Sequence, residues 1–187
     1  MHTNRFFFFP SASFGWLISE EDFFKNAFPN VDKLKIRVSS GILGKDNISN
    51  DAMLYKRYFE ITNGPSYAFG TNINPTYALY TDNAYPSTDI TWEKTSSTNV
   101  GVELTMWNGL LTAEFDAFYK YTWDILENVA WQYPTSLGGY YATKANSGEM
   151  DVRGLELTLG HRNTINEFTY GVKGNISWAR NKLLKQI

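Results

Sequence analysis

The sequence predicts an all-β chain, an antiparallel up-and-down segment of a transmembrane β-barrel. Three observations predict it: apolar and polar side chains alternate strictly, compact turns alternate with long polar loops, and aromatic residues make up 17% of the chain. Successive side chains of a strand point to opposite faces, so each alternating segment has one apolar and one polar face. Segments of about ten residues with this pattern are typical of strands that cross a membrane.

Six segments carry this alternation. In the clearest, Val100, Val102 and Leu104 take one face, while Gly101 and Glu103 take the other. The expected strands cover residues 9–18, 33–43, 90–107, 110–125, 152–162 and 168–180. We therefore expect about six strands of a larger barrel.

One short helix is expected between the first two strands. Ser19 is followed three residues later by Asp22, which resembles a capping box with Asp in the last place. The helix should run to about Phe28 and end before Pro29. Acidic residues suit the positive end of a helix, which explains Glu20 and its neighbours better than an acid/base pair does.

The connections differ in length from one end of the strands to the other. Residues 44–88 and 127–147 are long polar segments, which we expect on the extracellular side, whereas the other turns are compact and expected in the periplasm. Asn108-Gly109 between two alternating runs is a strong hairpin signal. A two-residue loop there places Glu103 opposite Glu114 and Gly101 opposite Asp116.

Two carboxylates that face each other are unfavourable on an isolated hairpin, which suggests water or a cation nearby. We therefore expect a charged belt on the inner wall of the barrel. Its candidate lumen-lining residues are Arg37, Glu103, Glu114, Asp116, Glu156 and Lys173. In the alternative interpretation they only solvate a lumen and contact no substrate.

Aromatic residues fall into two groups. Phe6–Phe9, Trp92 and Trp123 are expected at the extracellular strand ends, where barrels carry an aromatic girdle. Loop aromatics are candidates for stacking on sugar rings, for packing against a lid protein, or for packing against one another. These are Tyr55, Tyr58, Tyr67, Tyr77, Tyr80, Trp131, Tyr133, Tyr140 and Tyr141.

Composition argues against several other classes. The net charge is −2 and no basic run is present, so nothing indicates a nucleic-acid partner. There is no cysteine, and the only histidines are His2 and His161, so no metal or cofactor is expected. His161 is expected at the membrane interface. No nucleophile or phosphate-binding motif occurs, so an enzyme is not expected.

Several segments, in order, also carry a family resemblance. Residues 8–16 and 18–21 read FFPSASFGW and ISEE, residues 89–95 read DITWEKT, and residues 174–182 read GNISWARNK. Further pieces are LKIRVSSG, GKDNI, FDAFYK, NSGEM and RGLEL. Together these motifs resemble the SusC/RagA-type TonB-dependent outer-membrane receptors of Bacteroidetes.

The resemblance implies a piece from the later part of a barrel of about 22 strands with a plugged lumen. It also implies import of glycans or oligopeptides, a SusD-like surface lipoprotein as partner, and energy relayed by TonB. Residues 1–187 are expected to be a partial barrel, in which the plug domain, the TonB box and the terminal strand are missing. TonB would act through the missing N-terminal part.

Two other functions remain as alternatives. A soluble carbohydrate-binding β-sandwich would also suit antiparallel strands rich in aromatics, but it would pack its apolar faces against each other. A glycoside-cleaving enzyme needs two carboxylates across a cleft, and only the charged belt supplies carboxylates close together. The destination of the apolar face, lipid or a second sheet, separates the barrel from the sandwich.

Overall fold

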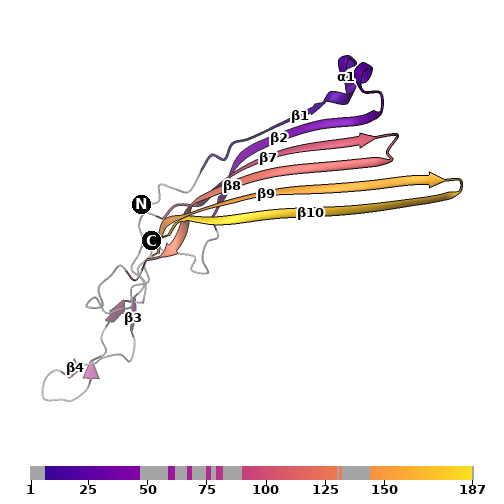
Figure 1. The fold of residues 1–187 in the computed structure, drawn as a ribbon. Coiled ribbons are helices and arrows are strands. Elements are labelled where there is room, and N and C mark those ends of the chain that lie inside the picture. The colour runs from indigo at the N-terminus through magenta and orange to yellow at the C-terminus, as the bar shows by residue number, and fades with distance from the viewer. Residues whose placement is uncertain are drawn as a thin grey trace.

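The computed structural model describes residues 7–46, 59–61, 67–68, 75–76, 79–81, 90–129, 131 and 144–186. Its main feature is one antiparallel sheet of six strands in the order β1-β2-β7-β8-β9-β10. The strands are β1 (Ser11–Leu17), β2 (Val31–Lys45), β7 (Glu93–Met106), β8 (Leu111–Asn128), β9 (Lys144–Ile165) and β10 (Phe168–Lys185). Each strand pairs with the next along the sheet, and Figure 1 shows them as one open, twisted layer. The up-and-down topology is confirmed.

Four short strands lie within the segment between β2 and β7. The strand β3 (Phe59–Ile61) pairs with β6 (Leu79–Thr81), and β4 (Tyr67–Ala68) pairs with β5 (Pro75–Thr76). Figure 1 places β3 and β4 beyond the end of the sheet that lies opposite α1. The long connection predicted there therefore carries two small hairpin pairings of its own.

The first residues of β9, here called its upper part, were predicted as loop, and this prediction was wrong. The strand begins at Lys144, eight residues before the expected position 152, and β8 continues to Asn128. A register shift between Thr122 and Ile125 interrupts the ladder, but the pairing then resumes from Leu126 with Asn146 to Asn128 with Lys144. Residues 144–148 are polar or small, so they gave no apolar period from which a strand could be predicted.

The predicted hairpin register is confirmed. Met106 pairs with Leu111, Glu103 with Glu114, and Gly101 with Asp116. Asn108 and Gly109 have positive φ, as a two-residue hairpin turn requires, and the Leu110 amide donates to the Trp107 carbonyl at 3.3 Å. Trp107 also has a positive φ, of 57°, which such a turn does not require. The β9–β10 turn is tighter than the predicted 163–167, because Ile165 already pairs with Phe168.

The helix is present but its predicted cap is wrong. A 3-10 helix (Ile18–Glu20) comes first, and α1 (Asp22–Ala27) begins after Glu21, which makes no side-chain capping bond. Ser19, the predicted cap, lies inside the 3-10 helix, and its buried hydroxyl has no hydrogen-bond partner among the described residues. The neighbouring carboxylates make other contacts: Glu20 accepts from Lys25 at 2.8 Å and Glu21 accepts from Trp16 at 3.0 Å. Neither helix of the described part is long and apolar enough to cross a membrane.

The register gives the sheet two different faces. One row of neighbours across all six strands is apolar: Trp16, Ile36, Val102, Phe115, Leu157 and Ile176. The adjacent row on the other face is mostly polar: Gly15, Arg37, Gly101, Asp116, Glu156 and Ser177.

No second layer covers the apolar face among the described residues. Among the described residues Val129 is the only buried apolar side chain. On the apolar face, Ile176 is 69% and Trp178 is 53% exposed. A β-sandwich would have packed these side chains against a second sheet. The described residues therefore do not form a β-sandwich, and their exposed apolar face fits the predicted membrane barrel.

Candidate functional site

The apolar face is bounded by aromatic residues at two levels. On β10, Tyr170 and Trp178 lie on this face, eight positions apart, which corresponds to about 26 Å along a strand. With the strand tilt usual in membrane barrels, this spans about 20 Å, close to the ~25 Å apolar band of such barrels. His161 lies at the lower level, with its Nε2 atom 3.2 Å from the Tyr170 hydroxyl. The structure thus places His161 at the edge of the apolar band.

The polar face carries an ion cluster centred on Arg37. Its Nη2 atom donates to Glu114 at 2.8 Å and to Asp116 at 2.7 Å, and its Nε atom lies 3.7 Å from Glu103. Lys33 Nζ donates to the other oxygen of Glu103 at 2.7 Å. We call Lys33, Arg37, Glu103, Glu114 and Asp116 the inner cluster. It explains how Glu103 and Glu114 can face each other: two cations lie between or beside them.

A glycine makes the central contact possible. Arg37 starts on β2 and reaches carboxylates on β8, so its side chain must cross β7 at Gly101, which pairs with both Arg37 and Asp116. A Cβ atom at position 101 would collide with Arg37 Nε and would lie 2.7 Å from Asp116 Oδ1. Gly101 therefore provides the path along which the guanidinium reaches its partners.

The six predicted belt residues share one face, but only four join this cluster. Glu156 pairs with Asp116 and Ser177 across the sheet. Lys173 lies opposite Gly160, in the same row as Thr112. Among the described residues neither makes an ion pair.

The sequence analysis did not include Lys33 among the belt residues. Lys33 and Arg37 are four positions apart on β2, so their side chains lie on the same face of the sheet. The signal was available in the parity of Lys33, Lys35 and Arg37 along the strand. Water or a cation was expected near the facing carboxylates, and the structure shows two cationic side chains there, Lys33 and Arg37.

At the opposite end of the sheet, Asn146 joins three elements. Its Oδ1 atom accepts from the Thr91 backbone at 2.8 Å, and its Nδ2 atom donates to the carbonyls of Thr91 at 2.9 Å and Asp124 at 2.6 Å. Asp124 has a φ of 57° within the interruption of β8, and its carboxylate accepts from Lys94 at 2.8 Å. The bases of both long connections are thereby tied together. Residues 55 positions apart make this contact, so no local signal could have revealed it.

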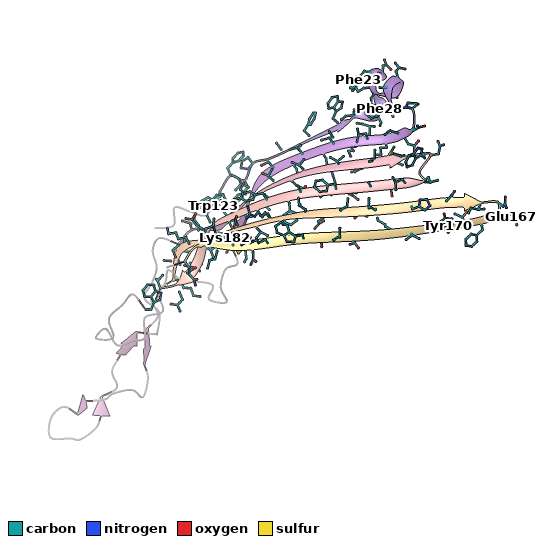
Figure 2. The ribbon with its side chains drawn as sticks, viewed as in Figure 1. Phe23, Phe28, Trp123, Glu167, Tyr170 and Lys182 are labelled. Carbon is teal, nitrogen blue, oxygen red and sulfur yellow. The ribbon has the colours of Figure 1, made fainter. Side chains whose placement is uncertain are left out.

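Aromatic side chains gather at this same end. Phe9 stacks on Trp92 with centroids 5.7 Å apart, Phe7 lies 5.5 Å from Trp92, and Tyr121 stacks on Trp123 at 5.6 Å. In Figure 2, Trp123 and Lys182 lie at this end, whereas Phe23, Phe28 and Glu167 lie at the other. These aromatics therefore lie at the strand ends that the sequence predicts to be extracellular.

Of the predicted loop aromatics, only Trp131 has a described side chain, and it is 67% exposed. The backbones of Tyr67 and Tyr80 belong to β4 and β6, but their side chains are not described. The others lie outside the described residues: Tyr55, Tyr58, Tyr77, Tyr133, Tyr140 and Tyr141.

Proteins of a known family are similar to this chain in sequence and in fold. The family described as TonB dependent receptor-like, beta-barrel matches residues 3–185. TonB-dependent receptor SusC of Bacteroides thetaiotaomicron is 30% identical over 183 residues, which are 97% of this chain and 18% of that protein. TonB-dependent receptor P39 of Formosa agariphila is 31% identical over 181 residues, covering 95% of this chain and 16% of that protein.

Solved structures agree with the fold. The RagAB peptide transporter gives a TM-score of 0.76 at 23% identity, over 100% of this chain and 19% of that chain. The RagAB peptide importer in its open-open state gives a TM-score of 0.79 at 22% identity, over 98% and 19%. The chain spans less than a fifth of the length of each of these proteins. It belongs to the TonB-dependent receptor-like β-barrel family, whose barrels lie in the outer membrane.

Proposed function

We propose that the chain forms part of the wall and the extracellular loops of an outer-membrane importer of glycans or oligopeptides. The single-layer sheet carries this proposal: one face is apolar from β1 to β10, and the other holds the inner cluster. A membrane barrel around a polar lumen requires this division. The relatives named as TonB-dependent receptors and the structures titled as a peptide transporter support the same role.

The free-energy cost of placing charged side chains in lipid favours a position in which the charged face lines the lumen. An Arg or Lys that faces lipid at the bilayer midplane costs about 2–4 kcal/mol. In a water-filled lumen the same charges cost little, and each half-exposed ion pair contributes roughly 0–1 kcal/mol. Arg37 is 39% exposed and Glu114 is 46% exposed, so they suit a hydrated wall. We propose that Glu156 and Lys173 line this lumen together with the inner cluster.

The partners follow from the same proposal. A SusD-like surface lipoprotein would contact the extracellular loops, and TonB would act on the whole receptor to drive import. The loop aromatics, including Tyr55 and Trp131, would contact the lipoprotein or the substrate. We assign no catalytic role, because the inner cluster ties its carboxylates to Arg37 and Lys33.

Deletion and complementation test this function. We expect a strain that lacks the receptor containing this segment to lose growth on one substrate class, glycan or peptide, as sole source. The intact gene should restore growth, and a copy from which the TonB box has been removed should not. Unchanged growth and uptake on every glycan and peptide tested would contradict the proposal.

A further inference from the structure

Above the apolar band, β9 and β10 carry two arginines that face each other directly. Arg153 pairs with Arg180 in the register of the two strands. Arg153 shares the parity of Leu155, and Arg180 shares that of Trp178, so both lie on the apolar, lipid-side face. Like charges directly opposite each other destabilise a sheet unless something neutralises them.

No protein group among the described residues neutralises these two arginines. The ion pairs of the described part involve Lys25, Lys33, Arg37, Lys45 and Lys94 as cations, and both arginines are exposed.

Two carboxylates lie one level higher on this face, and neither forms an ion pair with Arg153 or Arg180 in the described part. Glu149 accepts from the Tyr121 hydroxyl at 2.6 Å. Asp151 lies opposite Lys182 in the register, and its buried Oδ1 atom has no hydrogen-bond partner among the described residues. Two positive charges therefore face each other at the Arg153–Arg180 level without an ion-pair partner in the described part.

Neighbouring residues give the level of this pair in the membrane. Arg153 also pairs with Tyr119 on β8, and the row directly below contains Ala117, Leu155 and Trp178. Tyr and Trp prefer the boundary between hydrocarbon and headgroups. Figure 2 places Lys182, two residues beyond Arg180, at the end of the sheet opposite Glu167 and the tight turns. Since the tight turns are periplasmic, this boundary is the outer leaflet.

We propose that Tyr119, Arg153 and Arg180 bind a phosphate group of a phosphorylated glycolipid in the outer leaflet. Guanidinium groups hold phosphate with paired, charge-assisted hydrogen bonds, and basic sites at headgroup level are a known way to recognise anionic lipid. The lipid phosphate neutralises the two facing arginines, while its acyl chains cover Leu155 and Trp178. The argument rests more on Arg153 than on Arg180. Both strands beside Arg153 are described, whereas Arg180 lies on β10, which is the edge of the described sheet.

The proposal rests on the outer-membrane placement of the barrel but not on import. If deletion of the receptor leaves uptake unchanged while the wild-type receptor retains the lipid and R153Q/R180Q loses it, only the importer proposal fails. If deletion abolishes uptake but R153Q/R180Q retains as much lipid as the wild type, only this site fails. The two claims are therefore separable.

The test uses the full-length receptor, extracted from outer membranes in mild detergent. Phosphorylated glycolipid per receptor is measured by mass spectrometry for the wild type and for R153Q/R180Q. We expect about tenfold less retained glycolipid in the double variant, since two charge-assisted contacts are lost. The matched control is K120Q/K173Q, which removes two cations from the opposite face and should retain as much lipid as the wild type. Equal retention by R153Q/R180Q and the wild type would overturn the proposal.

Two further measurements keep the outcome decisive. If R153Q/R180Q does not assemble, wild-type receptor is compared in vesicles of phosphorylated and enzymatically dephosphorylated glycolipid, and only the former should raise its melting temperature. R153K/R180K, which keeps both charges, should retain most of the lipid. An equal melting temperature in both vesicles, or full displacement of the lipid by millimolar inorganic phosphate, would overturn a lipid-specific site.

Discussion

The two faces of the sheet achieve compatibility with their surroundings in different ways. At the centre of the inner face, charges are paired within the chain: Arg37 and Lys33 meet three carboxylates. The outer face leaves apolar side chains such as Val172, which is 68% exposed, for the bilayer to cover. The inner face therefore depends on contacts within the protein, and the outer face depends on contacts with lipid. The same substitution should change the free energy of unfolding by different amounts on the two faces.

The largest difference should come from a charge placed on each face at adjacent positions. Leu157→Arg puts a cation into the apolar row, and we expect a loss of about 2–4 kcal/mol in the free energy of unfolding. Thr158→Arg points the same side chain into the lumen and should change stability by roughly 0.5 kcal/mol or less. Denaturant unfolding of the full receptor in vesicles measures both. Equal losses would show that the two faces are not lipid and lumen.

The inner cluster should depend on Arg37. Arg37→Ala leaves Glu103, Glu114 and Asp116 close together with only Lys33 as a counter-charge. We expect a loss of about 1–3 kcal/mol, the cost of leaving part-buried charged groups without a partner. Lys35→Ala is the matched control, because Lys35 lies on the same strand and face yet makes no ion pair within the described chain. The same unfolding assay should show a clearly smaller loss for the control.

The effect of a substitution at Gly101 on stability should depend on whether Arg37 is present. Gly101→Ala places a methyl group against Arg37 Nε and Asp116 Oδ1, and displacing Arg37 should cost about 1–2 kcal/mol. In the Arg37→Ala background the same change should be nearly neutral, because the methyl group then has room. A double-mutant cycle measures this coupling. Strict additivity would show that Arg37 does not cross at Gly101.

The smallest effect should come from an ion pair that belongs to neither face. The Glu20 carboxylate accepts a hydrogen bond from Lys25 beside α1 and thereby raises the pKa of Lys25 above its usual 10.5. A raised folded-state pKa stabilises below the unfolded value, and this contribution is lost as pH rises through the raised pKa. NMR titration should show a lower pKa for Lys25 in Glu20→Gln, with no measurable change in stability at neutral pH. An unchanged titration would refute the pair.

The sequence predicted the faces and the hairpin, because these depend on neighbouring residues. Alternation from Val100 to Glu103 defines parity, and Asn108-Gly109 defines how β7 meets β8. The pairing of β2 with β7 spans the long connection, so local pattern could not give the contact of Lys33 with Glu103. The same holds for Asn146 and Thr91.

Two local predictions failed, for different reasons. The capping box is absent because Ser19 lies inside the 3-10 helix and α1 begins only at Asp22. The upper part of β9 escaped notice because both of its faces are polar above the apolar band, so no period distinguishes strand from loop there.

Labelling of single cysteines tests the central claim most directly, because the chain contains no cysteine of its own. Cysteines would be placed at Val102, Glu103, Glu114 and Phe115 of the full receptor in native outer membranes. We predict that positions 103 and 114 react with a water-soluble maleimide, and that fluorophores at 102 and 115 are quenched by brominated lipid. Lipid quenching at 103 and 114, with aqueous labelling at 102 and 115, would reverse the two faces and contradict the account.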